Sequence, residues 1–335
     1  MIGACLVSAS ALMRIPLVCF GQSTSSTETT RTFATAAQYT SDERISTEAT
    51  VEHGLITRCE VPARGQPALL LPAAAVGLAA PEALTMIACS PGSPGTTAEA
   101  QPRMDAVATA VGTRAHVTLH ASYAADERDG VAALEHIAIG LVSLPFFLAH
   151  ERELDLHPQL IAVAAGRPAL DRWAMVSQRG RVQRGADLAG VTVFASVAYA
   201  PAFVRGCVLG QLGVLPHDFQ LVQSTSVLSA LRRAAAGEPV AVVVDGTEEG
   251  AVPSLPFASR LEVSARSPSL PAAVVVTVRD RVPAETWSSV AAAMRGLSAD
   301  QEGTSALAGV QLARFVELDR DALAIARASY TEGAR

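Results

Sequence analysis

The chain has 335 residues, of which half are apolar and 17% are charged, and its formal net charge at pH 7 is −6. This length allows two or three domains with a large core, and the negative charge argues against a nucleic acid as partner. The five cysteines lack the spacing of a metal site, and their odd number gives no disulfide framework. We therefore expect the two in the globular part, Cys89 and Cys207, to be buried small apolar residues.

The first 83 residues lack the pattern of a folded domain. Half of residues 23–50 are Ser or Thr, and such a segment buries too little apolar surface to fold, so we expect disorder. An export signal is predicted at about residues 58–80, where basic residues precede the apolar run 67–80 and its small-residue end. We expect translation to begin near residues 55–65. The alternative is an apolar linker or a membrane-anchoring segment.

From residue 84 the chain alternates strand-like and helix-like patterns. The apolar run Leu84–Cys89 predicts the first strand, and a turn-rich segment follows it. Apolar residues at helical spacing from Met104 to Val111 predict a helix that ends at Gly112. The further elements predicted before residue 172 are a strand at 115–119, a helix at 124–136, a strand at 137–142 and a strand at 160–165. This alternation predicts a first lobe built on a parallel sheet.

A second lobe is predicted at residues 173–271. Its predicted elements are strands at 173–178, 191–195, 219–223 and 240–244 and a helix at 227–235. The linker Ser267–Pro271 then returns the chain to the first lobe, which we assign to residues 84–172 plus 272–335. In this last part the sequence predicts a strand at 272–278, a helix that starts at Pro283 and a final helix capped by Asp319.

Four segments carry a resemblance to a known family. They are Ala138–Phe146, Asp187–Phe194, Ala230–Val244 with the following Asp245, and Pro268–Pro271. With them, residues 84–335 resemble the phosphonate, phosphite and phosphate-type solute-binding proteins of bacterial ABC transporters, which have the type 2 periplasmic-binding fold. The resemblance implies a two-lobed α/β fold in which each lobe is a parallel-rich sheet flanked by helices. It also implies a ligand cleft between lobes that close about a hinge.

The same resemblance implies a function. It indicates an exported, extracytoplasmic (periplasmic) protein that delivers a small, phosphonate-like anionic solute to the permease of an ABC importer. It implies a monomer that uses no cofactor and catalyses no reaction. In open parallel sheets, ligands bind beyond the carboxyl ends of the strands, where amide groups at helix starts favour an anion. We therefore expect a cleft lined by helix N-termini.

Five residues are candidates for ligand contact. The family usually has a Ser-Thr-Ser-Gly-like turn after the lobe-two strand, whereas the segment 195–201 of this chain offers hydroxyls from two residues only. The candidates are Tyr123 after the predicted second strand, Ser143 at the end of the third, Ser196 and Tyr199 in this segment, and Asp245 at the end of strand 240–244. Each also has a structural explanation, as a loop tyrosine, a turn residue or a cap of a turn.

Two other functions stay open at this point. The depleted hydroxyl loop is compatible with a ligand-sensing or interaction protein that kept the fold and lost the anion site. An enzyme on the same two-lobed fold would need acid and base groups that converge in the cleft, and Asp245 is the one residue with a claim to that role. His136, His150 and His157 lie seven or more residues apart, so their spacing predicts no metal site.

Overall fold

The computed structural model describes residues 83–93, 96–216 and 219–335, which all belong to one compact unit. The predicted disordered segment and the predicted export signal fall in residues 1–82 and so lie outside the described residues. Among the helices of the described ranges, none combines the length and the apolar character that a membrane span requires.

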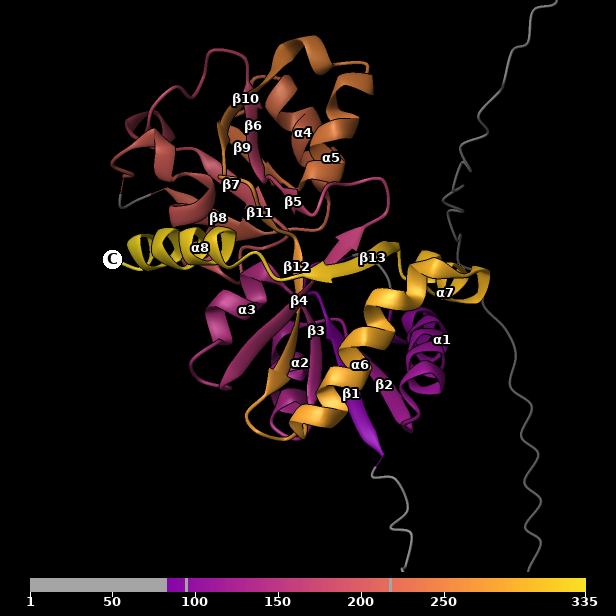
Figure 1. The fold of residues 1–335 in the computed structure, drawn as a ribbon. Coiled ribbons are helices and arrows are strands. Elements are labelled where there is room, and N and C mark those ends of the chain that lie inside the picture. The colour runs from indigo at the N-terminus through magenta and orange to yellow at the C-terminus, as the bar shows by residue number, and fades with distance from the viewer. Residues whose placement is uncertain (1–82, 94–95, 217–218) are drawn as a thin grey trace, which may run out of the picture. The chain divides into compact units, whose positions relative to one another are not determined.

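A six-stranded sheet forms the first lobe, lobe 1, with the strand order β13-β4-β12-β3-β1-β2 (Figure 1). β1 pairs in parallel with β2 and β3, whereas β12 is antiparallel to both β3 and β4, so the sheet is mixed. Its strands are β1 (Leu84–Cys89), β2 (Leu119–Ala124), β3 (Ile139–Ser143), β4 (Leu156–Ala164), β12 (Ala273–Val278) and β13 (Leu312–Glu317).

Both faces of this sheet are covered by core residues, and successive side chains of a strand point to opposite faces. In β1, Met86 and Ala88 belong to one core cluster, which also holds residues of α1 and α6, whereas Ile87 and Cys89 belong to another. The helices of this part of the chain are α1 (Thr97–Ala115), α2 (Glu127–Leu134), α3 (Leu144–His150), α6 (Ala284–Gly296), η6 (Leu297–Ala299), α7 (Gln301–Gly309) and α8 (Arg320–Gly333).

A five-stranded sheet forms the second lobe, lobe 2, with the order β10-β6-β9-β7-β8. β7 is parallel to β8 and β9, and β6 is antiparallel to β9 and β10. All five residues of β9 are buried, as its unbroken valine-rich run predicts for a central strand. The elements are β6 (Ala174–Gln178), η1 (Gly185–Leu188), β7 (Thr192–Ala195), the π-helix η2 (Phe203–Val208), η3 (Gly210–Leu212), β8 (Gln220–Gln223), α4 (Val227–Ala235), β9 (Val240–Val244), α5 (Gly246–Ala251), η4 (Val252–Ser254), η5 (Ala258–Arg260) and β10 (Leu261–Arg266).

The chain crosses between the lobes in two short strands that lie side by side. β5 (Leu170–Asp171) pairs antiparallel with β11 (Leu270–Pro271). Beyond this pair, the N–H of Trp173 donates to the hydroxyl of Ser267 at 3.0 Å, and the N–H of Ser267 donates to the carbonyl of Trp173 at 2.8 Å. These paired crossings are suited to act as a hinge. The domain limits at residues 172/173 and 271/272 stay a prediction.

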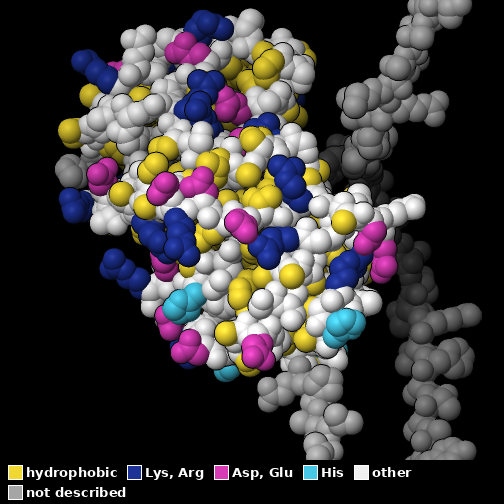
Figure 2. Space-filling view, viewed as in Figure 1, with side chains coloured by type: hydrophobic (Ala, Val, Ile, Leu, Met, Phe, Trp, Pro, Cys, Tyr) yellow, Lys and Arg dark blue, Asp and Glu magenta, His cyan; other side chains and the backbone are white. Residues whose placement is uncertain are grey.

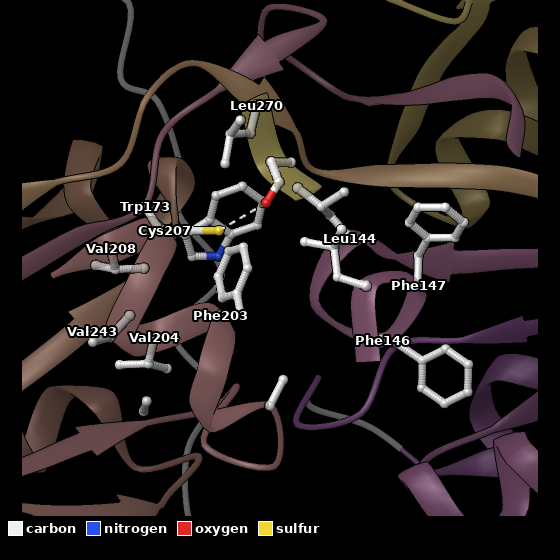
Figure 3. Close-up of a cluster of buried hydrophobic side chains, with 14 of the residues drawn as sticks. Leu144, Phe146, Phe147, Trp173, Phe203, Val204, Cys207, Val208, Val243 and Leu270 are labelled. Carbon is white, nitrogen blue, oxygen red and sulfur yellow. Dashed lines mark hydrogen bonds between the residues drawn. The ribbon is translucent and has the colours of Figure 1, made fainter. Parts of the chain in front are cut away.

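One apolar cluster spans both lobes (Figure 3). Phe146 and Phe147 of α3 contribute to it from lobe 1, and Phe203 and Val204 of η2 contribute from lobe 2; all four are fully buried. The C-terminal helix α8 adds residues to the same cluster, and its Arg327 pairs with Glu151 at the end of α3. The lobes are therefore joined by packing as well as by the two crossing strands.

The buried cysteines predicted from the sequence are confirmed, whereas one predicted strand and the predicted end of the first helix are wrong. Cys89 and Cys207 are buried and unpaired, as expected. The strand predicted at 115–119 is wrong, because α1 continues through Ala115 and ends where His116 takes the left-handed conformation, with φ of 57°. Gly112 lies inside the helix, where a Cβ would stand 2.7 Å from a backbone oxygen of the next loop. No element was predicted from the sequence at the positions of β10, β13 or α7.

Candidate ligand site between the lobes

The carboxyl ends of parallel strands from the two lobes meet at one place. The loop after β1 and the end of β3 in lobe 1 contact the loop after β7 in lobe 2. This is the position at which α/β proteins bind ligands, because the loops that follow parallel strands converge there. The meeting point is therefore the candidate ligand site.

A hydrogen bond between two predicted ligand residues crosses this meeting point. The hydroxyls of Ser143 and Tyr199 lie 3.0 Å apart, one from the end of β3 and one from the loop after β7. Ser143 is also the N-cap residue of α3, yet its side chain makes no capping bond and is directed to the tyrosine instead. Burial raises the pKa of the Tyr199 phenol well above its usual value, so the phenol is neutral at physiological pH.

The loop after β7 is held from both sides. In lobe 1, Gly92 has φ of +83°, and a Cβ built on it would stand 2.1 Å from the carbonyl oxygen of Ser196. In lobe 2, the side-chain amide of Gln223 donates to that same carbonyl at 2.5 Å, and its oxygen accepts from the N–H of Tyr199 at 2.9 Å. The close approach requires glycine at position 92.

A cavity of about 460 Å³ opens beside this contact. Lobe 1 supplies Pro91 and Gly92 and residues 125–129 at the start of α2, and lobe 2 supplies Tyr199 and Gln223. Walls from both lobes are the arrangement that lets a bound solute stabilise the closed form. Its size is within the usual range for a small-molecule site.

The five residues predicted to contact the ligand lie in different surroundings. Tyr199 lines the cavity, and Ser143 bonds to its hydroxyl without lining the cavity itself. Tyr123 is half-buried against the lobe 1 core, and desolvation raises its pKa. Ser196 takes part through its carbonyl. Asp245 caps α5 and does not line the cavity. Its contacts are therefore those of a helix cap and not those of a ligand residue.

Sequence reasoning missed Gln223, Gly92 and the start of α2. Gln223 is the last residue of a predicted strand, so its place at the carboxyl end of a parallel strand was the available signal. Gly92 lies in the predicted turn cluster after the first strand, but nothing in the sequence marks its contact with residue 196. Such a contact depends on how the two lobes meet.

Two helix starts near the cleft, those of α1 and α2, are capped by side chains of the chain itself, which differs from the expected free amides, whereas the side chain of Ser143 leaves the start of α3 uncapped. Thr96 and Glu99 form a capping box on α1, and Asp126 accepts from the N–H of Asp129 at the start of α2. These carboxylates satisfy amide groups that an anion would otherwise bind, and they add negative charge. The site is therefore less suited to a bare dianion than the family resemblance implies.

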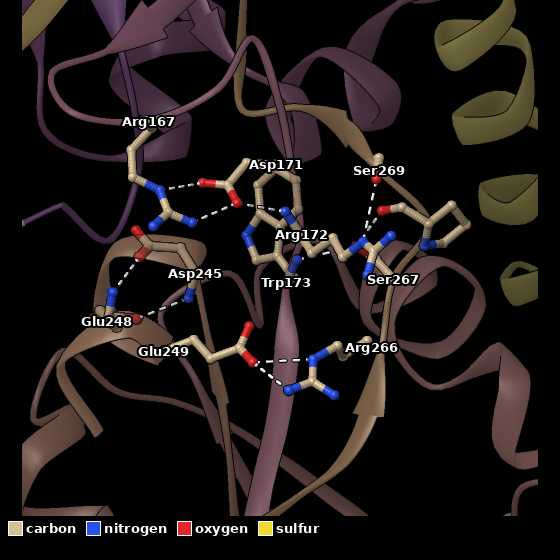
Figure 4. Close-up of polar contacts among 11 residues, drawn as sticks. Arg167, Asp171, Arg172, Trp173, Asp245, Glu248, Glu249, Arg266, Ser267 and Ser269 are labelled. Atoms are coloured by element: carbon tan, nitrogen blue, oxygen red, sulfur yellow. Dashed lines mark hydrogen bonds and ion pairs between the residues drawn. The ribbon is translucent and has the colours of Figure 1, made fainter. Parts of the chain in front are cut away.

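A polar network lies where the first crossing strand meets α5 (Figure 4). Arg167 forms a bidentate pair with Asp171, at 2.7 and 2.6 Å, and a Cβ on Gly246 would stand 2.1 Å from this guanidinium. Asp245 and Glu248 form a capping box at the start of α5, with bonds of 2.8 and 3.0 Å. The network seats α5 of lobe 2 against the hinge.

The pKa of Glu248 gives a pH-dependent stability. Burial and then the nearby Asp245 raise it from 4.5 to about 7. Between these pH values the folded state holds a proton that the unfolded state has lost, so stability falls as pH rises from 4.5 to 7. We expect Glu248→Gln to match the wild type at pH 4.5 and to be more stable by about 1–2 kcal/mol at pH 8, after allowance for solvent screening. Melting curves across this range, with Glu249→Gln as control, measure it; parallel profiles for wild type and Glu248→Gln would contradict it.

The two hydrogen bonds of Gln223 predict a second result. Gln223→Glu keeps the acceptor for the N–H of Tyr199 but places a carboxylate oxygen against the carbonyl of Ser196, so we expect a loss of about 1 kcal/mol in unfolding free energy. Gln220→Glu on the same strand is the matched control, because Gln220 only accepts, from the hydroxyl of Thr192. Equal effects of the two substitutions in urea unfolding would show that Gln223 does not hold the loop.

In the part of the chain that the structure describes, no group of three or more His, Cys, Asp or Glu side chains could hold a metal ion. The cavity instead offers the phenol of Tyr199, the amide of Gln223, and three carboxylates with one guanidinium at the start of α2, in residues 126–129. These groups are suited to hold a small polar solute.

Comparisons with known proteins agree with the two-lobed fold. The binding component of an ABC phosphonate transporter from Pseudomonas aeruginosa is 15% identical, with a TM-score of 0.56 over 76% of this chain and 87% of that chain. A Xanthomonas citri protein bound to ATP is 14% identical, with a TM-score of 0.60 over 75% of this chain and 98% of that one. A Prochlorococcus marinus protein in complex with methylphosphonate is 12% identical, with a TM-score of 0.50 over 73% and 97%.

At these identities the structural likenesses show the fold alone, and no curated protein matches the chain. The family described as the periplasmic substrate-binding protein of phosphonate ABC transporters matches residues 90–323, roughly 70% of the sequence. The resemblance predicted from the sequence is thereby confirmed. The chain belongs to this family and is a solute-binding protein of an ABC importer.

Proposed function

We propose that the chain binds a small zwitterionic, phosphonate-like solute in the cavity between its lobes, delivers it to an importer permease and catalyses no reaction. The observation that carries this proposal is the cavity itself, which has walls from both lobes at the carboxyl ends of parallel strands. A solute that touches both walls binds the closed form better than an open one, and its differential affinity shifts the population toward closure.

The charges around the cavity support a zwitterion over a dianion. Asp126, Glu127 and Asp129 lie in its wall with one guanidinium, that of Arg128, and Glu127 also contacts the ring of His150 at 2.9 Å. A cationic group of the solute can face these carboxylates, while its oxyanion accepts from the amide of Gln223 or from the guanidinium. A bare dianion would meet net repulsion from the same wall.

One observation favours the alternative of a ligand-sensing or interaction protein. The Ser143–Tyr199 hydrogen bond joins the two lobes through side chains of the chain itself. The closed arrangement of the lobes is therefore stabilised in part without a solute. A gene neighbourhood with a permease and an ATPase supports transport, whereas a neighbouring kinase supports sensing. An enzyme lacks a specific observation in its favour, since the described cavity wall holds no nucleophile paired with a base.

Export and oligomeric state also belong to this proposal. An extracytoplasmic location is supported by the family, and the predicted signal at 58–80 would direct it. A monomer that binds no nucleic acid is supported by the net charge of −6 and by the face in Figure 2, where acidic and basic side chains are interspersed. N-terminal sequencing of the secreted protein tests the signal, and a mature start near residue 20 would contradict it.

A thermal-shift screen of the full chain tests the ligand. The probes are methylphosphonate, aminomethylphosphonate, phosphate, phosphite, a sulfonate and several amino acids. A solute at 100 times its dissociation constant stabilises by about 2.7 kcal/mol. We expect aminomethylphosphonate to give the larger shift of the two phosphonates, and no shift with any probe would favour the sensing protein.

A charge variant makes this test specific. Asp129→Asn should reduce the preference for aminomethylphosphonate over methylphosphonate by about 3- to 10-fold, because it removes one carboxylate from the cavity wall. Glu135→Gln, at the far end of the same helix, is the matched control. Calorimetric titration of both variants gives the ratio, and an unchanged ratio in Asp129→Asn would contradict the proposed orientation.

A further inference from the structure

Tyr199 lines the cavity and is half-buried. Its ring packs against the apolar cluster that spans both lobes, and its hydroxyl reaches Ser143 at 3.0 Å on the lobe 1 side. Both hydroxyls are thus satisfied within the chain. The side chain bridges the two lobes at the point where their strand ends converge.

The backbone that carries this ring is fixed. Gln223 bonds to the N–H of Tyr199 and to the carbonyl of Ser196, at 2.9 and 2.5 Å. From lobe 1, Gly92 blocks movement of the Ser196 carbonyl, since the two are in contact. Removing the ring would therefore leave its space behind instead of letting the loop collapse into it.

The phenol also divides the site. Of the five residues predicted to contact ligand, only Tyr199 forms a wall of the cavity. Ser143 is not among the residues that line the cavity, and its hydroxyl bonds to that of Tyr199. While this bond is made, a solute in the cavity meets the tyrosine and not the serine.

We propose that the Tyr199 side chain acts as an internal substitute for a ligand group: it occupies the inner end of the cleft, bonds to Ser143 in the solute's place and confines the solute to the outer cavity. The inference rests on the proposed function and extends it, because it makes Tyr199 the residue that limits solute size. Removing the phenol would open the space of its ring to the cavity and free the serine hydroxyl.

Small aromatic probes test this without any knowledge of the natural solute. Tyr199→Gly should bind phenol in the vacated space and gain about 3 °C or more in melting temperature at a saturating concentration, whereas the wild type should gain nothing. Tyr199→Phe keeps the ring, so it should not bind phenol either. Tyr199→Ala is the second cavity variant if Tyr199→Gly does not melt cooperatively.

The hydrogen bond to Ser143 predicts which aromatic probe binds more tightly. Phenol should bind Tyr199→Gly about 3- to 10-fold more tightly than benzene, which lacks the hydroxyl. The double variant Ser143→Ala with Tyr199→Gly should lose that preference. A folded Tyr199→Gly or Tyr199→Ala that takes up neither probe would overturn the proposal, as would equal binding of phenol and benzene to Tyr199→Gly.

A measurement on the wild-type protein covers the case in which both cavity variants fail to fold. Tetranitromethane nitrates exposed tyrosines through their phenolate, so Tyr199 should be nitrated at least 10-fold more slowly in the folded protein than after denaturation. Equal rates would overturn the proposal. If these tests fail, the result of the solute screen still stands. If no solute shifts the melting temperature in that screen, the prediction of phenol binding still stands, so the two proposals can fail independently.

Discussion

Gly206→Ala is expected to destabilise the protein by about 3 kcal/mol, because two backbones touch at this glycine. A Cβ at position 206 would stand 1.8 Å from the carbonyl oxygen of Ser329 and 2.8 Å from the amide nitrogen of Gly333. Both atoms belong to the backbone of α8, so the helix as a whole would have to move away from η2. Close-packed interiors do not absorb such a shift.

The displacement would reach the cluster that joins the lobes. Leu323 and Ala326 of α8 are buried there, and the thiol of Cys207 lies 3.6 Å from the carbonyl oxygen of Ala326. Gly210→Ala is the matched control, since the nearest atom to its Cβ is 4.0 Å away, and we expect a change within about 0.5 kcal/mol. Denaturant unfolding of both variants measures the difference. Equal stabilities would mean that α8 does not bind tightly to lobe 2.

Gly92→Ala is expected to weaken the contact between the lobes at the ligand site. The substitution meets two penalties, a left-handed conformation with φ of +83° and a clash with the carbonyl of Ser196 at 2.1 Å. We expect a loss of about 2–4 kcal/mol in unfolding free energy and at least a tenfold loss in solute affinity. The affinity falls because Gly92 is part of the cavity wall and its displacement moves one wall from the other.

Gly166→Ala separates the two penalties. Gly166 also has a positive φ, of +72°, but a Cβ on it would meet nothing within 4 Å. Its cost should be about 1 kcal/mol from the backbone conformation alone, with no change in solute affinity. If Gly92→Ala and Gly166→Ala have the same melting temperature and the same solute affinity, the contact between Gly92 and Ser196 contributes nothing to stability or to binding.

The sequence was informative where a local pattern determines the structure. The valine run of β9 predicted a strand buried on both faces, and Asp319 predicted the cap of the last helix, and both are observed. The alternation of strands and helices, read with the family segments, led to the two-lobed fold. These features depend on neighbours in the chain, so a single sequence contains them.

The candidate site was harder to predict because its geometry depends on how the lobes meet. Ser143 and Tyr199 were both identified, but their bond to each other follows from the packing of two lobes and has no local signal. Asp245 has the position of a ligand residue and the contacts of a helix cap, and sequence alone could not choose between them. The caps at the starts of α1 and α2 belong to no sequence-based prediction, and their consequence for anion binding follows from the position of the cavity beside α2.

The most direct test of the account is a crystal structure of the full chain with the solute that gives the largest thermal shift. We predict that the solute contacts Tyr199 or Gln223 from lobe 2 and, at the same time, Gly92 or the start of α2 from lobe 1. A solute bound to one lobe only, or bound away from this cavity, would contradict the account.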